Sequence, residues 1–322
     1  MSAVSVVATV LNEVGDIDRL VTSLMEQTIA PAEVIIVDGG STDGTWERLQ
    51  AAKTKYPDLI PIRDESCRLP NSPGPISRGR NVAIAAASSD LVACVDAGCT
   101  YQPDWLERLT ASILSGESEY ALGGSCIDPE RPTVWDIASA AFFGVKLSAD
   151  AKTKSCTARS MAFRKELWRR VGGFPEHILF GEDTVFDLKV RALVRPTFAE
   201  RAKAFYRPRH TLPSALGQMA RYSLSDGVAG VRPARLLRNL ARCVLEIVAV
   251  SLLGRTVIPL LCALALEVYF AFRLDWRSLR GSSARAFAAR MLFSLLVPWV
   301  VAWNQIKGTI TNANQPNPQN LS

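Results

Sequence analysis

Short apolar stretches alternate with helix-like segments over the first 130 residues, and this alternation limits the possible fold more than any other feature of the sequence. The apolar stretches are rich in β-branched residues and are predicted to be strands: Val4–Val10, Glu33–Val37, Leu59–Arg63 and Leu91–Val95. Helices are predicted over 16–27, 43–54, 77–87 and 103–114. Near-continuous apolar strands separated by helices are typical of parallel sheets. We therefore expect an α/β fold with a mostly parallel sheet covered by helices on both faces.

Helix starts in this part are predicted from residues that commonly cap helices. Thr42 and Ser77 are candidate N-caps, and Pro103 suits a first helical turn. After residue 155 the pattern becomes an α+β mixture, with strands expected in "CTARSMAFR" and at 198–205 and a helix at 165–170. We expect a domain over residues 1–230, apolar helices over 231–311, and a disordered Asn/Pro/Gln-rich tail over 312–322.

Acidic residues follow two of the predicted strands. Asp38 precedes two glycines, and Asp96 follows "LVACV". Ligands of parallel α/β sheets bind beyond the carboxyl ends of the strands. Asp38 could therefore accept hydrogen bonds from a nucleoside, or it could only cap the next helix. Asp96 could hold a hard divalent cation on a diphosphate. Arg80, on the helix that enters the same edge, could neutralise phosphate or be an ordinary exposed arginine.

A third acidic stretch, "GEDTVF" at 181–186, places Glu182 beside Asp183 just before apolar residues. Two carboxylates cannot share a packed interior without a cation or a proton between them. One of them could serve as a general base. The alternative is that both only favour the positive end of the helix that they open.

The order of these motifs is more specific than any one of them. "ATVLNE", "VDGGSTDGT", "GRN", "VDAG" and "GGFPE…GED" together closely resemble the family 2 glycosyltransferases with the GT-A fold, over roughly residues 3–230. The resemblance implies that Thr9, Glu13 and Asp38 contact the nucleoside, and that Arg80 lies near the base or the diphosphate. It further implies that Asp96 is the first acid of the D-x-D metal motif. Asp183 would be the catalytic base of an inverting transfer, with Glu182 orienting it or contacting the acceptor.

Two motifs depart from the family pattern. The D-x-D reads Asp96-Ala97-Gly98, so the second acid is absent. Asp96 with diphosphate oxygens and waters could still hold the expected Mg²⁺ or Mn²⁺. His210 in "YRPRHTL" could add a ligand or be only a surface residue. "QMARY" at 218–222 is similar to the Q-x-x-R-W of processive polysaccharide synthases. It makes Gln218 and Arg221, one helical turn apart, candidates for acceptor or diphosphate binding. An ordinary amphipathic helix is the alternative.

Charge is divided unevenly along the chain, with a net charge of −6 over residues 1–200 and +12 over residues 201–322. Such asymmetry indicates nucleic acid or an anionic membrane surface as a partner. The arginines of the basic part are interleaved with Leu, Val and Ala rather than with stacking aromatics, which disfavours nucleic acid. The seven cysteines form no C-x-x-C pair and are expected to be buried thiols in a reducing compartment. With no signal peptide before Val4, the N-terminal half is expected to stay in the cytosol.

Three apolar stretches lie in the basic part, at 236–253, 256–272 and about 287–303. At 1.5 Å per residue, 17 or 18 helical residues rise about 26 Å, close to the hydrocarbon thickness of about 30 Å. Charged residues within two of them, such as Arg242 and Glu246, count against spans. Five arginines between 273 and 290 are typical of a cytoplasmic loop. We expect a membrane hairpin plus a third helix, in the inner membrane, with the catalytic domain on the cytoplasmic face. A soluble helical subdomain or a dimer interface is the alternative.

These features favour a membrane-associated enzyme that moves a sugar from a nucleotide sugar to a hydroxyl of a glycan or lipid-linked acceptor. A nucleotidyltransferase is a rival, although it would want a Gly-rich phosphate loop where this chain has "ATVLNE". A catalytically impaired, membrane-anchored nucleotide-sugar-binding module is a second rival, because the D-x-D is reduced.

Overall fold

The computed structural model describes residues 3–128, 133–140, 158–206, 211–251 and 283–313, together with positions 261, 264, 265, 268 and 269. The chain forms two compact units, residues 1–129 with 144–207 and residues 130–143 with 208–322. The boundary expected at residue 230 falls inside the second unit. The helix at Leu212–Val228 therefore belongs to the same unit as the later helices. His210, most of the stretch 256–272 and the tail after residue 313 lie outside the described residues.

One mixed sheet of eight strands forms the first unit, in the order β3-β2-β1-β4-β7-β6-β8-β5. The strands are β1 Val4–Val10, β2 Glu33–Asp38, β3 Leu59–Arg63, β4 Leu91–Val95, β5 Cys99–Tyr101, β6 Tyr120–Ile127, β7 Ser160–Arg164 and β8 Thr197–Tyr206. The first four in the chain are mutually parallel, as expected. β7 runs antiparallel to both β4 and β6, β8 is parallel to β6, and β5 is antiparallel to β8. β5 and β6 were not predicted.

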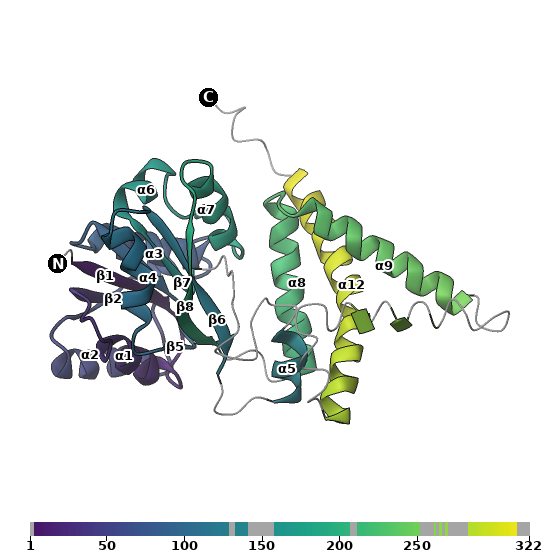
Figure 1. Cartoon of the computed structure of the whole chain (residues 1–322), viewed down its shortest axis with the longest axis horizontal. Helices are drawn as coiled ribbons and strands as arrows, with labels where there is room; N and C mark the ends of the chain where they lie inside the picture. The colour runs from purple at the N-terminus through teal and green to yellow at the C-terminus, as the bar shows by residue number, and fades with distance from the viewer. Residues whose placement is uncertain are drawn as a thin grey trace. The chain divides into compact units, whose positions relative to one another are not determined.

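Both faces of the sheet carry helices, because side chains alternate along each buried strand. Val6 and Ala8 of β1 belong to a core with α1, α2 and α4, whereas Val7 belongs to a core with α3, α6 and α7. In Figure 1, α1 and α2 lie below the strands, and α3, α6 and α7 lie above them. These helices are α1 Ile17–Met25, α2 Thr45–Lys55, α3 Pro75–Ala86, α4 Trp105–Leu114, α6 Lys165–Arg170 and α7 Glu182–Arg191.

Three helix starts differ from the prediction. α2 begins after Gly44, which has a left-handed φ of 99°, rather than after Thr42. α3 begins after Gly74 rather than at Ser77, and a Cβ at Gly74 would lie 2.6 Å from the carbonyl oxygens of Glu176 and Ile178. α4 begins at Trp105, two residues beyond Pro103. The glycines decide the first two cases, through a backbone angle and a close approach that side-chain capping rules do not include.

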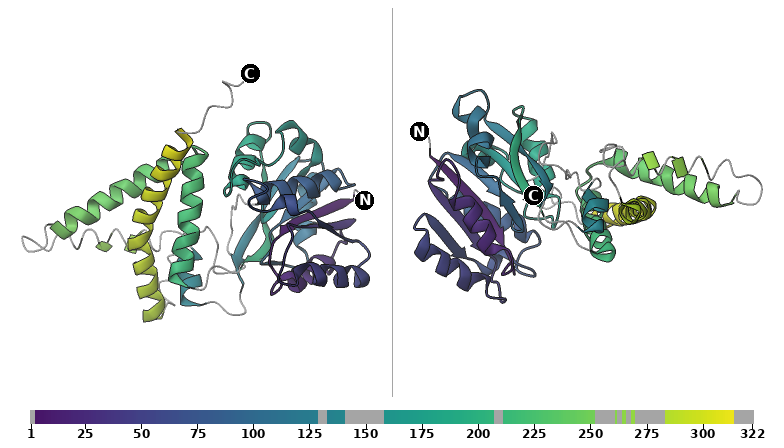
Figure 2. Two further views of the ribbon diagram at one scale, coloured as in Figure 1. Left: turned by 180° about the vertical axis from the view of Figure 1, so that it is seen from behind. Right: turned by 60° about the horizontal axis from the view of Figure 1, so that its bottom comes forward.

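The second unit contains α5 Val134–Ala140, α8 Leu212–Val228, α9 Pro233–Ser251 and the 30-residue α12 Ala284–Ala313. α12 packs against the other three, and most closely along α8, as both views in Figure 2 show. Two glycines make that approach possible. A Cβ at Gly227 would lie 2.1 Å from the Gln305 carbonyl oxygen, and one at Gly308 would lie 2.0 Å from the Leu224 carbonyl oxygen. The two backbones are therefore in contact at this point.

Burial in this unit is partly inverted. α9 buries Asn239 and Arg242, whose guanidinium donates to the carbonyl and hydroxyl oxygens of Ser294 on α12. Large apolar side chains are exposed instead, on α9 at Leu237, Val244, Ile247, Val248 and Val250, and on α12 at Leu292, Leu295, Trp299, Trp303, Ile306 and Ile310. Among the described helices, only the 284–311 part of α12 is long and apolar enough to cross a membrane, and 56 % of its most apolar 18-residue segment is buried. A core helix of a soluble protein can have the same length and composition.

Candidate active site

The carboxyl ends of β1, β2 and β4 place three of the predicted site residues at one edge of the sheet. Thr9 lies near the end of β1, Asp38 ends β2, and Asp96 directly follows β4. β1 is the middle strand of these three, with Val10 paired to Asp38 on one side and Val7 paired to Cys94 on the other. The parallel pairing therefore brings the strand-end acids to a common edge, as the sequence predicted.

Asp38 is fully buried and accepts hydrogen bonds from its own turn. The backbone amide of Ser41 lies 3.2 and 3.1 Å from its two oxygens, and the Ser41 hydroxyl also donates to it. Gly40, with a φ of 89°, provides the left-handed residue that this turn requires. The turn thus fixes the direction of the Asp38 carboxylate.

The loop after β1 is tied to the loop after β2 by four hydrogen bonds. The Asn12 amide donates to the Ser41 hydroxyl (2.8 Å), and the Thr42 amide donates to the Asn12 side-chain oxygen (2.9 Å). The Glu13 amide donates to the Thr45 hydroxyl (2.8 Å), and the Val14 amide to Asp43 (3.1 Å). Glu13 is therefore positioned through its backbone, and the two loops form one structure around Asp38.

Thr9 contacts α3 at Gly79. A Cβ at position 79 would lie only 2.1 Å from the Thr9 hydroxyl oxygen, so a side chain there would push the helix off the strand. This close approach brings Arg80, the next residue of α3, over the edge of the sheet.

Arg80 joins three elements and is the centre of the site. Its side chain is 5 % exposed, with Nη1 2.5 Å from Glu182 Oε1 and Nη2 2.6 Å from Asp96 Oδ1. The Phe174 ring lies beside the guanidinium, 5.4 Å from its centroid. A buried guanidinium needs such compensation, because an unpaired charge in this environment would cost several kcal/mol. The sequence indicated each residue but not this bridge.

The two acids of the GED stretch lie in different environments at the start of α7. Glu182 is buried against Arg80, whereas Asp183 is half-buried and accepts from the Thr184 amide at 2.7 Å. Burial raises the pKa of Glu182 to about 7, and the neighbouring Asp183 acts in the same direction, while Arg80 acts against both. The left-handed Gly181, with a φ of 79°, allows the chain to enter the helix just before these residues.

Arg159, which sequence reasoning did not single out, lies on the other side of Asp96. Its Nε is 3.8 Å from Asp96 Oδ2, and its guanidinium stacks over the Tyr206 ring at 4.0 Å from the centroid. The Tyr101 hydroxyl donates to the Arg159 carbonyl (2.9 Å) and accepts from the Asp96 amide (3.1 Å). The only signal in the sequence is an arginine directly before an apolar strand.

Two predicted acceptor residues, Gln218 and Arg221, belong to α8 of the second unit. Gln218 is buried and donates to the Tyr222 hydroxyl at 2.9 Å, whereas Arg221 is exposed. The two residues therefore differ in environment, although they are one helical turn apart.

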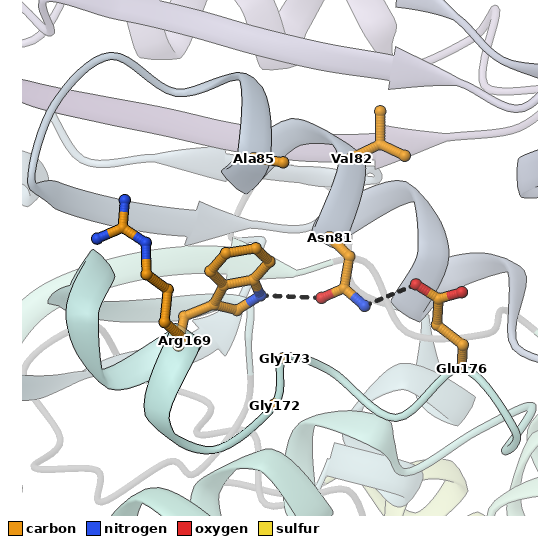
Figure 3. A pocket seen from close by; sticks show the side chains of 8 residues that line it. Asn81, Val82, Ala85, Arg169, Gly172, Gly173 and Glu176 are labelled. Carbon is orange, nitrogen blue, oxygen red and sulfur yellow. Dashed lines mark hydrogen bonds between the residues drawn. The ribbon is translucent and has the colours of Figure 1, made fainter.

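A pocket of about 510 Å³ is lined by residues of α3, of α6 and of the segment that follows α6. Figure 3 shows the Asn81 side chain pointing toward Glu176, whose carboxylate accepts from it at 2.8 Å. The Trp168 indole donates to the Asn81 side-chain oxygen at 2.9 Å. None of the predicted site residues lines this pocket. The chemistry indicated by the strand-end acids is therefore not located there.

Comparison with known proteins identifies the family. A model described as glycosyl transferase family 2 matches residues 5–172, about half of the chain. The chain belongs to this family. Glycosyltransferase AglE of Haloferax volcanii is 30 % identical over 186 residues, which are 56 % of this chain and 58 % of that protein. The succinoglycan biosynthesis protein ExoA of Rhizobium meliloti is 29 % identical over 216 residues, 63 % of this chain and 62 % of ExoA. The chain thus spans about three fifths of either relative.

Two solved structures show the same fold as this chain. Mannosyltransferase PcManGT from Pyrobaculum calidifontis, in complex with GDP-Man and Mn²⁺, aligns with a TM-score of 0.56 at 17 % identity, covering 98 % of this chain and 88 % of that one. S. aureus TarS in complex with UDP-GlcNAc aligns with a TM-score of 0.51 at 18 % identity, covering 96 % and 90 %. The expected GT-A fold is confirmed. At such low identity the likeness concerns the fold alone.

Proposed function

We propose that this chain is an inverting glycosyltransferase that uses a nucleotide-sugar donor and a hydroxyl acceptor. The observation that carries the proposal is the Arg80 bridge, which joins the strand-end acid Asp96 to the acidic pair at the start of α7. Family membership, the names of the relatives, and the donors in the titles of the solved neighbours support the same reaction class. The nucleoside is assigned to the edge formed by Thr9, Glu13 and Asp38, and the diphosphate to the side of Arg80.

Asp183 is the proposed general base. An inverting transfer needs a group that removes the acceptor proton as the hydroxyl attacks the anomeric carbon, and a cation that stabilises the departing nucleoside diphosphate. Glu182 is buried and engaged by Arg80, whereas Asp183 is half-buried and can be reached from solvent. We therefore assign proton removal to Asp183. Glu182 is assigned the task of fixing Arg80 and the start of α7.

The described residues do not supply a complete site for Mg²⁺ or Mn²⁺. Within the described ranges, no cluster of three His, Cys, Asp or Glu side chains could hold a metal ion. Asp96 stands without a second acid, since position 98 is glycine, and each of its oxygens faces a guanidinium. Mg²⁺ prefers an octahedral shell of oxygens, and guanidinium groups are not ligands. Besides Asp96, the expected metal would have diphosphate oxygens, waters and His210 as ligands, and His210 lies outside the described residues. No step of the proposed reaction uses the metal.

A panel of donors tests the function as a whole. We expect UDP-, GDP- or dTDP-sugars to raise the unfolding midpoint of the full chain in detergent, and one of them to be slowly hydrolysed without an acceptor. A nucleotidyltransferase would instead release pyrophosphate from a nucleoside triphosphate and a sugar phosphate. Donor binding without any hydrolysis or transfer would favour the impaired binding module.

Replacing Asp38 by alanine tests the nucleoside side. We expect donor affinity to fall by about 1–3 kcal/mol, or roughly 5- to 150-fold, because a buried acceptor and the Ser41 turn that it fixes are both lost. Titration calorimetry with the free nucleoside diphosphate measures this change. Asp18→Ala, at an exposed acid of α1, is the matched control and should bind like wild type. Unchanged affinity in Asp38→Ala would remove this residue from the site.

We propose that the second unit is in contact with membrane lipid. Its helices expose a run of large apolar side chains on α9 and α12, while Asn239, Arg242, Arg290 and Gln305 are buried. Water would favour the opposite arrangement, because exposed apolar surface costs about 25 cal/mol per Å². Trp303, 72 % exposed, suits a membrane interface. A glycan or lipid-linked acceptor at the inner membrane, with the first unit on the cytoplasmic face, is the assignment that agrees with this surface and with cytosolic nucleotide sugars.

Membrane fractionation tests this assignment. We expect the full chain to sediment with membranes, to remain there in high salt, and to be released by detergent, because salt screens charges but leaves apolar contacts intact. Immunoblots of the washed fractions measure the distribution. Release of the protein by salt alone would mean that arginines, and not the apolar helices, hold it to the surface.

A further inference from the structure

Arg159 belongs to a rigid group of four residues at the edge of the sheet. Its side chain stacks over Tyr206 at 4.0 Å, and its carbonyl is held by the Tyr101 hydroxyl at 2.9 Å. The same hydroxyl accepts from the Asp96 amide. Arg159 is 8 % exposed, so its guanidinium has little freedom. A side chain held in this way has little conformational entropy to lose when it binds a ligand.

The topology brings this group to the proposed donor site. β7 is antiparallel to β4, with Ser160 paired to Val95, so β7 begins where β4 ends. Arg159 directly precedes β7 and therefore lies at the same edge as Asp96 and Arg80. β6 and β8 also end at this edge, which is why Tyr206, the last residue of β8, can lie under the guanidinium.

The charges around Asp96 differ from those of a metal-binding acid pair. Oδ1 lies 2.6 Å from Arg80 and Oδ2 lies 3.8 Å from Arg159, so one carboxylate is placed between two guanidiniums. Two carboxylates with a divalent cation have no net charge, whereas one carboxylate between two guanidiniums has a net charge of +1. With glycine at position 98 in place of the second acid, Arg159 supplies positive charge at Asp96 without a metal ion. Guanidinium groups bind phosphate oxygens through paired, charge-assisted hydrogen bonds.

We propose that Arg159, together with Arg80, binds the diphosphate of the donor, and that Asp96 positions these two guanidiniums rather than mainly ligating a metal. This inference rests on the proposed function, since it assigns a role within the same donor site. Donor binding should then persist after divalent cations are removed. The diphosphate, and not the nucleoside, is the part of the donor that Arg159 recognises.

Calorimetric titration of the full chain in detergent and EDTA tests this, with UDP and GDP compared against uridine and guanosine. In Arg159→Gln we expect the affinity for the preferred diphosphate to fall about 10- to 100-fold, since hydrogen bonds to charged groups are the strong ones. The affinity for the matching nucleoside should be unchanged, and Arg159→Lys should fall between. Arg108→Gln, at an arginine of α4 paired with Asp104, is the control and should bind like wild type.

The results that would overturn the inference are distinct from those that would overturn the function. If wild type binds the diphosphate and Arg159→Gln binds it equally well, the role of Arg159 is wrong and the donor site stands. Loss of diphosphate binding in EDTA, restored by Mn²⁺ equally in both proteins, would also reject it. Loss of nucleoside and diphosphate affinity together would assign Arg159 a structural role only. If wild type binds no nucleoside diphosphate, the proposed function fails with it.

Discussion

Asp183→Asn is expected to lower the rate of sugar transfer by about 10²- to 10⁴-fold, the range that a general base contributes. The amide keeps the size of the side chain and can still accept from the Thr184 amide, so α7 should begin as in wild type. The affinity for the nucleoside diphosphate should stay near the wild-type value, because the variant removes a proton acceptor and no donor contact. Transfer assays and titration calorimetry on the same preparation separate the two effects.

The control for this experiment is Glu166→Gln, which neutralises an exposed acid on α6 that pairs with Arg169. It should transfer sugar at the wild-type rate. Asp183→Asn retaining more than about a tenth of the wild-type rate would contradict the assignment, since base catalysis is worth far more than that. Glu182→Gln is expected to differ from Asp183→Asn. It should weaken donor binding as well as transfer, because Arg80 loses the carboxylate that holds its guanidinium in place.

Arg80→Leu is expected to destabilise the first unit by about 3–5 kcal/mol, the cost of leaving buried charges without their partner. Asp96 and Glu182 would both lose the guanidinium that lies between them. Arg78→Leu, two residues earlier on α3, is the matched control. Its pair with Glu176 is 40 % and 39 % exposed, and its Nε also donates to the Ser66 hydroxyl at 2.7 Å, so the loss should be about 1–2 kcal/mol. Unfolding midpoints of the full chain in detergent measure both.

A rescue variant makes the result specific. Adding Glu182→Gln to Arg80→Leu removes the buried charge that the single variant leaves uncompensated, while Asp96 keeps Arg159 beside it. Most of the lost stability should return, although donor binding should not. If the double variant is as unstable as Arg80→Leu, the cost arises from lost packing against Phe174 and not from charge.

Much of the fold could be predicted from the local sequence pattern. The strand that was missed shows why other parts of the fold could not. The bounds of β1, β3, β4 and α6 match the prediction, because each is a short run whose composition suits its structure. β6 was missed because its sequence, "YALGGSCI", contains two glycines that usually weaken a strand. Gly123 is needed there for a tertiary reason. A Cβ would lie 1.9 Å from the Ser160 hydroxyl of β7 and 2.8 Å from the Ala202 carbonyl of β8.

The candidate site shows the same division. Asp38 and Asp96 stand at strand ends and the acidic pair stands at a helix start, where the sequence marks them. Arg80 was indicated, but its two partners are 16 and 102 residues away, and only the folded sheet brings them together. The only local mark of Arg159 is its position directly before an apolar strand. Its environment depends on Tyr101 and Tyr206, which belong to β5 and β8, the last two strands in the order of the sheet.

The order in which the chain is made gives the second unit an unusual requirement. α5, at residues 134–140, packs on α12, which begins at residue 284, so about 140 residues must leave the ribosome before α5 meets its partner. A seven-residue helix is too short to persist alone in water. During synthesis the first unit must therefore fold while the inserted residues 130–143 have not yet met α12. A shortened chain that stops before α12 would keep this insertion without its contacts on α12, and no single cut removes one unit cleanly from the other.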